Sequence, residues 1–137
     1  MSSGYDHRSL DELDDNPHKP TPRYEISKAF DIGDYNLNIA VLEPGKPLSQ
    51  THYHAHDDQE EFYYVFDGKC RIEVEEESFD LVEDDVIVVR EGTPHLLHNP
   101  YDEPCRLIAI GSPPEGRYPV TMYDNYENVL DDRYGGE

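Results

Sequence analysis

The sequence predicts an all-β protein, folded as a β sandwich or a closed barrel. Short runs of residues alternate apolar with polar side chains, and turn signals separate them roughly every eight to twelve residues. The central part of the chain has no amphipathic helical pattern. Since successive side chains of a strand point to opposite faces, alternating runs form strands with one face on a core.

The strand signals follow one another from Tyr35 onward. Residues 35–42 alternate for most of their length, and Cys70, Ile72 and Val74 alternate with charged neighbours. Asp67-Gly68 is a dipeptide typical of a hairpin turn between two strands. We expect further strands in the dense apolar runs 61–66, 79–81, 86–89 and 107–110.

The distribution of apolar residues divides the chain into three parts. Residues 1–22 are polar and contain three prolines, which predicts an N-terminal arm. Residues 23–112 carry the strand signals and form the predicted barrel, and residues 113–137 form a tail rich in Tyr and Pro. A chain of 137 residues fits one domain with a sizeable core.

The charge balance argues against two classes of partner. There are 31 acidic and 11 basic residues, with a formal net charge of -20. Such a surface repels nucleic acid and anionic membranes, so we expect neither as a partner. The imbalance is also typical of proteins from salt-adapted organisms, where high charge maintains solubility, although an ordinary acidic protein is the alternative.

Cysteine usage predicts the compartment. Cys70 and Cys105 are too few for a disulfide scaffold, and residues 1–15 lack the apolar segment of a signal peptide. No apolar run approaches the length needed to span a bilayer. We therefore expect a cytoplasmic protein with two reduced thiols, or with one disulfide if the fold brings the two together.

A cluster of histidines is the most informative local feature. His52, His54 and His56 would all point the same way on an extended strand, and Glu61 follows shortly after. A second histidine group lies at residues 95–98. Imidazoles and carboxylates are ligands of transition metals, which predicts a metal site on a β scaffold. The alternative is a set of core or surface histidines without a metal.

The spacing of these groups resembles the two motifs of the cupins, which are small jelly-roll barrels also called double-stranded β-helices. The first motif is matched by His54-Ala55-His56, Glu61 after four intervening residues, and Gly68 after six more. The second is matched by residues 84–95 and by Asn99, which follows after three intervening residues. The resemblance covers roughly residues 37–110 and implies a cupin barrel with short N- and C-terminal extensions.

The resemblance implies that one divalent metal is held inside the barrel, with four ligands: His54, His56, Glu61 and His95. The metal could be Fe, Mn, Ni, Co, Cu or Zn, because the ligand types admit them all. Gly45 lies slightly too far before His54 for the family pattern, so a second register with His52 and His54 as the pair stays open. We favour His54 and His56, since the distance to Glu61 is the tighter constraint.

Four further residues are candidates for the surroundings of the site. His52 and His98 are expected beside the ligands or at the pocket mouth, and Tyr63 shares the face of Glu61 by strand alternation. Glu60 faces the other way and is expected in solvent. Arg90 stands where the second motif usually has proline; it could hold a substrate carboxylate, but a salt bridge to one of the many acids is favoured.

The resemblance implies two functions from different classes. The first is a metal-dependent enzyme, of dioxygenase or isomerase type, that acts on a small polar molecule. The second is a non-catalytic module that binds or senses a small ligand, because one fold hosts many functions. The family also implies a homodimer, in which Tyr24 to Phe30 would join the sheet of the partner; the alternative is a monomer in which this segment folds back on its own barrel.

Overall fold

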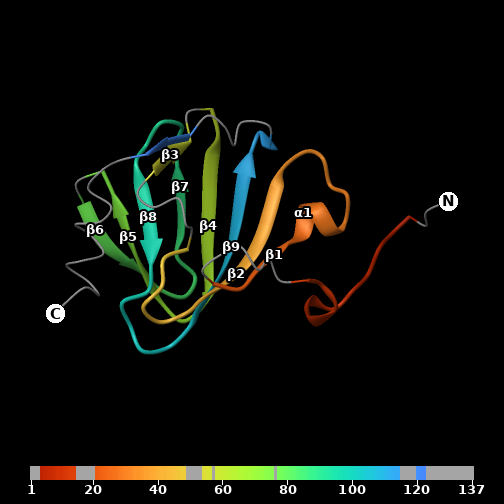
Figure 1. Ribbon diagram of the computed structural model, residues 1–137, viewed down its shortest axis with the longest axis horizontal. Helices are drawn as coiled ribbons and strands as arrows, with labels where there is room; N and C mark the ends of the chain where they lie inside the picture. Colours follow the sequence, from red (N-terminus) through yellow and green to blue (C-terminus); the bar gives the residue numbers. More distant parts are fainter. Residues whose placement is uncertain are drawn as a thin grey trace.

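The computed structural model describes residues 4–14, 21–48, 54–56, 58–75, 77–114 and 120–122, with only the backbone for 54–56 and 120–122 (Figure 1). Within these ranges strands dominate. The strands are β1 (Arg23–Glu25), β2 (Asn36–Leu42), β3 (His54–His56), β4 (Glu60–Asp67), β5 (Cys70–Val74), β6 (Glu77–Leu81), β7 (Val86–Val89), β8 (His95–His98), β9 (Cys105–Ser112) and β10 (Val120–Met122). The helices are the 3-10 helix η1 (Leu10–Glu12) and the short helix α1 (Ile26–Ala29). None of the helices in the described ranges is long and apolar enough to cross a membrane.

The strands form two antiparallel sheets, each of five strands in the described part of the chain. The first sheet has the order β1-β2-β9-β4-β7 and the second β10-β3-β8-β5-β6. Strands that follow one another in the chain mostly alternate between the sheets, as in a jelly roll. The predicted all-β fold is therefore confirmed.

The hydrophobic core lies between the two sheets. In β9 every second residue from Cys105 to Gly111 is buried, as the alternating pattern of the sequence predicts. Leu107 and Val65 of the first sheet and Ile72 of the second are fully buried members of one apolar cluster. This packing leaves the first residues of β4 and β8 at one end of the barrel and the last residues of both at the other (Figure 1).

The segment from Tyr24 to Phe30 does not form one continuous strand that is free to join a partner. Its first residues belong to β1, which pairs with β2 of the same chain, and Ile26–Ala29 form helix α1. Ser27 holds this turn in place, because its hydroxyl donates to Tyr35 O at 2.7 Å and accepts from Leu37 N at 2.8 Å. The local hydrogen bonds of Ser27 therefore favour a return to the chain's own barrel.

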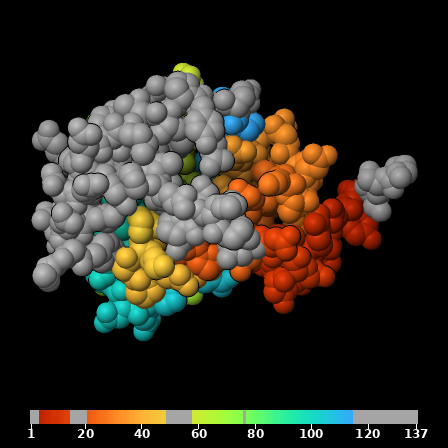
Figure 2. Space-filling view, in the orientation of Figure 1, coloured from red at the N-terminus to blue at the C-terminus, as the bar shows by residue number. Residues whose placement is uncertain are grey.

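Both chain extensions contact the barrel. In the arm, Arg8 donates to Ala29 O at 2.8 Å and stacks over the Phe30 ring, so residues 4–14 lie at the end of the molecule that carries α1 (Figure 2). In the tail, β10 pairs with β3, with Val120 opposite His56. The second sheet thus extends beyond residue 112, where the predicted barrel ends.

Cys70 and Cys105 meet in the core as free thiols. Both are fully buried, one at the start of β5 and the other at the start of β9. A hydrogen bond with Cys105, together with burial, raises the pKa of the Cys70 thiol. A thiol with a raised pKa forms little of the thiolate that reacts with electrophiles.

We expect both thiols to resist iodoacetamide at pH 8 in the folded protein and to react fully in denaturant. The reason is that the reagent must reach the sulfur atom, and both thiols are fully buried in the folded protein. Intact mass spectrometry at fixed times measures the number of labels. Stoichiometric labelling of the folded protein at the rate of a free thiol would contradict the buried, hydrogen-bonded arrangement.

Candidate metal centre

Glu61 and His95 come together at one end of the barrel, from opposite sheets. Glu61 is the second residue of β4 and His95 the first of β8. Glu61 Oε1 lies 2.8 Å from His95 Nε2. The His95 side chain is 1% exposed and that of Glu61 17%, so the imidazole is buried and the carboxylate is mostly buried. These two of the four predicted ligands therefore meet as the sequence interpretation requires.

The hydrogen bond of Nδ1, the second ring nitrogen of His95, determines which tautomer of the ring faces Glu61. Nδ1 lies 2.9 Å from Thr93 O, and a carbonyl oxygen only accepts, so Nδ1 carries the proton and donates. In the neutral ring Nε2 then holds a lone pair directed at the carboxylate. This backbone bond orients the ring in the way that is common for metal-bound histidines.

The donor set of Glu61 and His95 fits a metal ion. Two electron-pair donors 2.8 Å apart repel each other unless a cation, a proton or a metal, lies between or beside them. Neighbouring ligands at about 2.1 Å from one ion are themselves about 3 Å apart, which is close to the observed separation. A metal-free protein would need a proton on one of the two groups.

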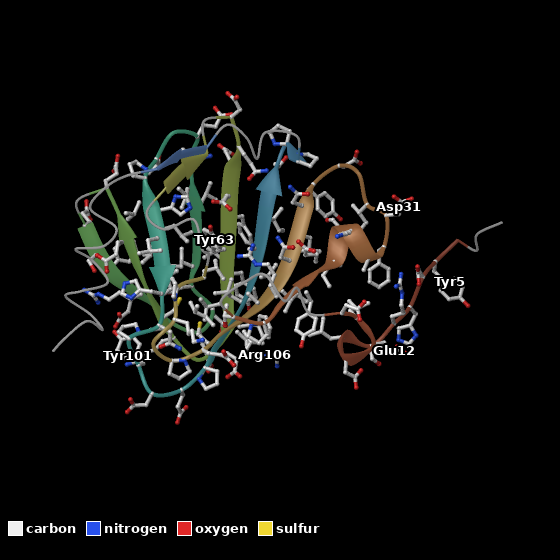
Figure 3. The ribbon with its side chains drawn as sticks, in the orientation of Figure 1. Tyr5, Glu12, Asp31, Tyr63, Tyr101 and Arg106 are labelled. Carbon is white, nitrogen blue, oxygen red and sulfur yellow. The ribbon has the colours of Figure 1, made fainter. Side chains whose placement is uncertain are left out.

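Tyr63 completes the described part of the centre. Its hydroxyl lies 3.3 Å from His95 Nε2, and the residue is 3% exposed in the middle of the barrel (Figure 3). Burial, followed by the negative charge of Glu61, raises the pKa of Tyr63 well above its ordinary value. The hydroxyl is therefore protonated at neutral pH and acts as a hydrogen-bond donor toward the centre.

The histidine strand lies beside this group, but its side chains lie outside the described residues. In the backbone register His54 is directly opposite His95. His52 and the side chains of His54 and His56 are not described, so the choice between the two ligand registers stays a prediction. Within the described side chains no group of three or more potential ligands gathers.

His98 does not lie at the centre. It follows His95 by an odd step on β8, so it faces away from the barrel interior that His95 and Leu97 share. It is fully buried, and its Nε2 lies 2.8 Å from Glu73 Oε2, which also accepts from the Ser78 hydroxyl at 3.0 Å. The expectation of a pocket residue is thus replaced by a buried polar pair on the other face of the sheet.

Arg90 lies outside the barrel as well. Its side chain is 73% exposed and its Nη1 lies 2.8 Å from Glu60 Oε2. This ion pair is the salt bridge that the sequence favoured, and the guanidinium does not face the interior. Glu60 is itself 46% exposed, in contrast to its inward-facing neighbour Glu61.

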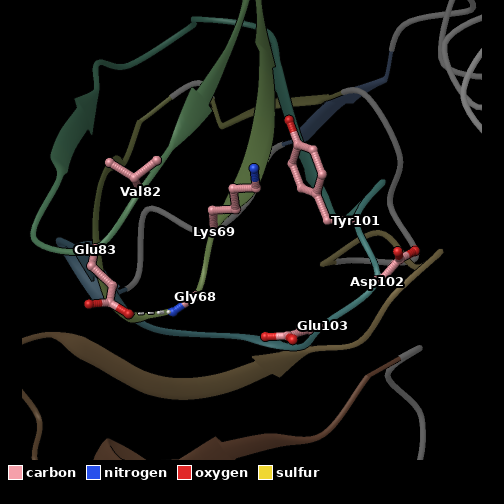
Figure 4. A pocket seen from close by; sticks show the side chains of 7 residues that line it. All are labelled: Gly68, Lys69, Val82, Glu83, Tyr101, Asp102 and Glu103. Atoms are coloured by element: carbon pink, nitrogen blue, oxygen red, sulfur yellow. Dashed lines mark hydrogen bonds between the residues drawn. The ribbon is translucent and has the colours of Figure 1, made fainter.

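A separate hollow of about 580 Å³ lies at the other end of the barrel (Figure 4). It is formed by residues that follow the ends of β4, β6 and β8, whereas Glu61 and His95 stand at the beginnings of β4 and β8. The lining residues are Gly68, Lys69, Val82, Glu83, Tyr101, Asp102 and Glu103. The Lys69 ammonium lies 4.2 Å from the centre of the Tyr101 ring. The hollow contains no imidazole and is not part of the candidate metal centre.

Comparison with known proteins places the chain in a family. The sequence profile of the cupin domain matches residues 38–111, more than half of the chain. The chain therefore belongs to the cupin family, and the resemblance of its two motifs is confirmed at the level of the fold.

Individual relatives share part of their length with this chain. It is 31% identical over 77 residues to a Streptomyces cyaneus protein named polyketide synthase CurC, a match that covers 56% of this chain and 48% of that protein. The chain thus spans about half the length of this curated relative. A second relative, an uncharacterised protein of Methanocaldococcus jannaschii, is 30% identical over 79 residues, which cover 58% of this chain and 61% of that one.

Solved structures share the fold at lower identity. A sugar phosphate isomerase from the cupin superfamily of Silicibacter pomeroyi superposes with a TM-score of 0.73 at 19% identity, covering 87% of this chain and 82% of that one. KdgF from Halomonas sp. superposes with a TM-score of 0.63 at 21% identity, and the match covers 75% of this chain and 90% of that one. At these identities the likeness shows the fold alone.

Proposed function

We propose that this cupin is a metal-dependent isomerase acting on a small polar molecule. The observation that carries the proposal is the 2.8 Å approach of Glu61 Oε1 to His95 Nε2, beside the buried hydroxyl of Tyr63. The structural neighbour from Silicibacter pomeroyi, described as a sugar phosphate isomerase, supports isomerase chemistry over the other reactions of the fold.

In this proposal His54, His56, Glu61 and His95 hold one divalent transition metal. The bound metal would act as a Lewis acid that polarises a substrate carbonyl. Glu61 contributes negative charge and His95 a neutral nitrogen, whose orientation Thr93 O maintains. The burial of His95 and the partial burial of Glu61 strengthen the electrostatic interaction between them, because water screens it less than at the surface.

Tyr63 would serve as a hydrogen-bond donor to a substrate oxygen. Its hydroxyl is protonated, lies next to Nε2 of His95 and is held inside the barrel by packing. A donor that is already in place needs no reorganisation when negative charge develops on that oxygen. We therefore assign to Tyr63 the role of orienting and stabilising the carbonyl oxygen that becomes more negative as the reaction proceeds.

The test is turnover by protein of known metal content. Protein loaded separately with Zn, Mn, Ni, Co and Fe is incubated with aldose, ketose and sugar phosphate panels, with and without oxygen. We expect interconversion of isomers that needs metal and does not consume oxygen. Metal-dependent oxygen uptake would indicate a dioxygenase instead, and tight ligand binding without any turnover would indicate a binding or sensor module.

We further propose that the protein is a homodimer formed through the outer face of the first sheet. Two rows of apolar residues cross this face at matching register: Leu37, Ile110, Phe62 and Val88, and then Ile39, Ile108, Tyr64 and Val86. Val86 is 61% exposed and Val88 42%. An apolar patch of this extent on a chain with net charge -20 supports burial against a second copy.

Val88→Glu is expected to convert the dimer to a monomer, because it would bury an unpaired charge within the apolar interface. Val82→Glu is the matched control, since Val82 is similarly exposed, at 45%, but lies at the separate hollow. Light scattering in molar KCl, where charge repulsion is screened, measures the mass. A wild-type monomer throughout the micromolar range, or a Val88→Glu dimer, would refute this interface.

Two buried, free thiols agree with a reducing compartment, so we also propose that the protein acts in the cytoplasm.

A further inference from the structure

Strand β10 of the tail borders the histidine strand β3 in the second sheet. This sheet has the order β10-β3-β8-β5-β6, so β3 lies between β10 and β8 (Figure 1). β10 pairs with β3 along its whole length, in three opposed pairs: Val120 with His56, Thr121 with Ala55 and Met122 with His54. On its other side, within the described ranges, β3 pairs with β8 at His54, opposite His95. Most of the described backbone pairing of β3 is therefore with β10.

Without β10, the histidine strand would be weakly held. β3 would become the edge strand of the second sheet and would keep the pairing at His54. Short strands with little pairing open readily, because few backbone hydrogen bonds and contacts oppose local unfolding. The position of His56 depends most on β10, since its partner in the described register is Val120 and not a residue of β8.

The beginning of the tail is fastened at the end of the barrel where Glu61 lies. Gln59 comes two residues before Glu61 and is 4% exposed, and its Nε2 donates to Pro113 O at 3.0 Å. Asn36, the first residue of β2, donates from Nδ2 to Pro114 O at 3.4 Å. Two side-chain amides at this end of the first sheet thus hold the chain as it leaves β9 toward β10.

The packing around Gly111 gives Gln59 a defined place. Gly111 of β9 lies opposite Glu61 on one neighbouring strand and opposite Asn36 on the other. A Cβ added to Gly111 would lie 2.7 Å from both Cδ and Oε1 of Gln59. The amide of Gln59 therefore rests on the backbone of β9, at the residue that Glu61 and Asn36 flank. Its hydrogen bond to Pro113 links the tail to the part of the first sheet that carries Glu61.

We propose that β10 is a strap that positions the histidine strand for metal binding, and that Gln59 is the positioning residue that secures it. The inference rests on the metal site of the proposed function and adds how that site is completed. Glu61 and His95 come from the barrel, whereas the strand of His54 and His56 is held in place by the tail. Groups that orient ligands without touching a metal alter its affinity about ten- to a hundredfold. Because coupling is reciprocal, a bound metal also holds β10 on the sheet.

The test uses three full-length variants. Gln59→Met keeps the length of the side chain and removes the donor to Pro113. Thr121→Pro combined with Met122→Pro removes two successive N–H groups of β10; one of them faces β3, because successive N–H groups of a strand point to opposite edges. Asn99→Leu is the control, since it removes another fully buried amide that donates to two backbone carbonyl groups, after the end of β8 and away from Glu61.

Two measurements are made on each variant. Hydrogen exchange of the metal-free protein measures the protection of residues 54–56, and competition with a chromophoric chelator measures the affinity for zinc. In the double-proline variant we expect exchange at least roughly tenfold faster and zinc affinity at least roughly tenfold lower. Gln59→Met should change both in the same direction by less. Asn99→Leu should lower the melting temperature and leave both unchanged, and zinc should slow exchange of residues 120–122 in wild type.

Equal exchange of residues 54–56 in wild type and the double-proline variant would overturn the strap, and so would an unchanged zinc affinity in a variant whose β3 does open. If the double-proline variant does not fold, Gln59→Met decides, and no change in either measurement overturns the proposal. Absence of zinc binding by wild type overturns the metal centre and the strap together. Zinc binding that depends on β10 and Gln59, without turnover of any substrate, overturns only the isomerase.

Discussion

Glu61→Gln is expected to weaken the binding of a divalent transition metal by at least roughly a hundredfold, while Glu60→Gln leaves it unchanged. Replacing the carboxylate by an amide removes the negative charge that lies 2.8 Å from His95 Nε2. Glu60 is the adjacent residue, but its carboxylate points outward and pairs with Arg90. His95→Ala should lower the affinity at least as much, since it removes a ligand altogether. Competition with a chromophoric chelator measures the affinity of each variant.

The two glutamates make a sharp comparison, because the substitutions are chemically identical and differ only in the face of β4 that they change. Metal loss in Glu60→Gln with full binding in Glu61→Gln would mean that the strand has the opposite phase. The same assay with His52→Ala and His56→Ala distinguishes the two ligand registers. We expect His56→Ala to lose the metal and His52→Ala to keep it.

Gly68→Ala is expected to lower the free energy of unfolding by about 2–5 kcal/mol. Gly68 has a φ of +81°, and a Cβ added there would lie 2.5 Å from Pro104 O and 3.2 Å from Cys105 Cα. Both neighbours are backbone atoms, so the chain itself must shift to make room. The turn after β4 and the start of β9 should therefore separate or distort.

Gly92→Ala is the matched control, with an expected loss of about 1–2 kcal/mol. Its φ of +74° carries the same left-handed cost, but nothing lies within 4 Å of an added Cβ. The difference between the two variants isolates the clash with Pro104. Urea unfolding at fixed metal occupancy measures both, because a bound metal stabilises the folded state separately. Equal losses in the two variants would show that the turn adapts without cost.

Periodicity determined most of the fold in advance. The alternation in β9 indicates a strand with one buried face, and the structure buries the expected residues, such as Leu107. In β5 the expected Cys70 and Ile72 are buried, but Glu73 is buried as well, so the opposite face is also partly covered. Asp67-Gly68 indicates a turn, and the backbone turns there with a positive φ at Gly68. These features follow from sequence alone because they depend on neighbours within a few residues.

The spacing of the motif residues also predicts the described part of the candidate centre, Glu61 and His95. The motif selected Glu61 over Glu60, and the side chain of Glu61 does reach His95 across the barrel. The other half, the side chains of His54 and His56, rests on the spacing and on the backbone register that places His54 opposite His95.

Only the tertiary structure decided the positions of His98 and of the segment after Glu25. His98 contacts Glu73 because β8 lies beside β5. The segment after Glu25 forms α1 because Ser27 bonds to Tyr35 and Leu37. Local periodicity predicts that successive side chains of a strand point to opposite faces of the sheet. Which strand pairs with a given strand depends on contacts between distant parts of the chain. The sequence therefore determined which residues could share a face, and the pairing of the strands decided which of them meet.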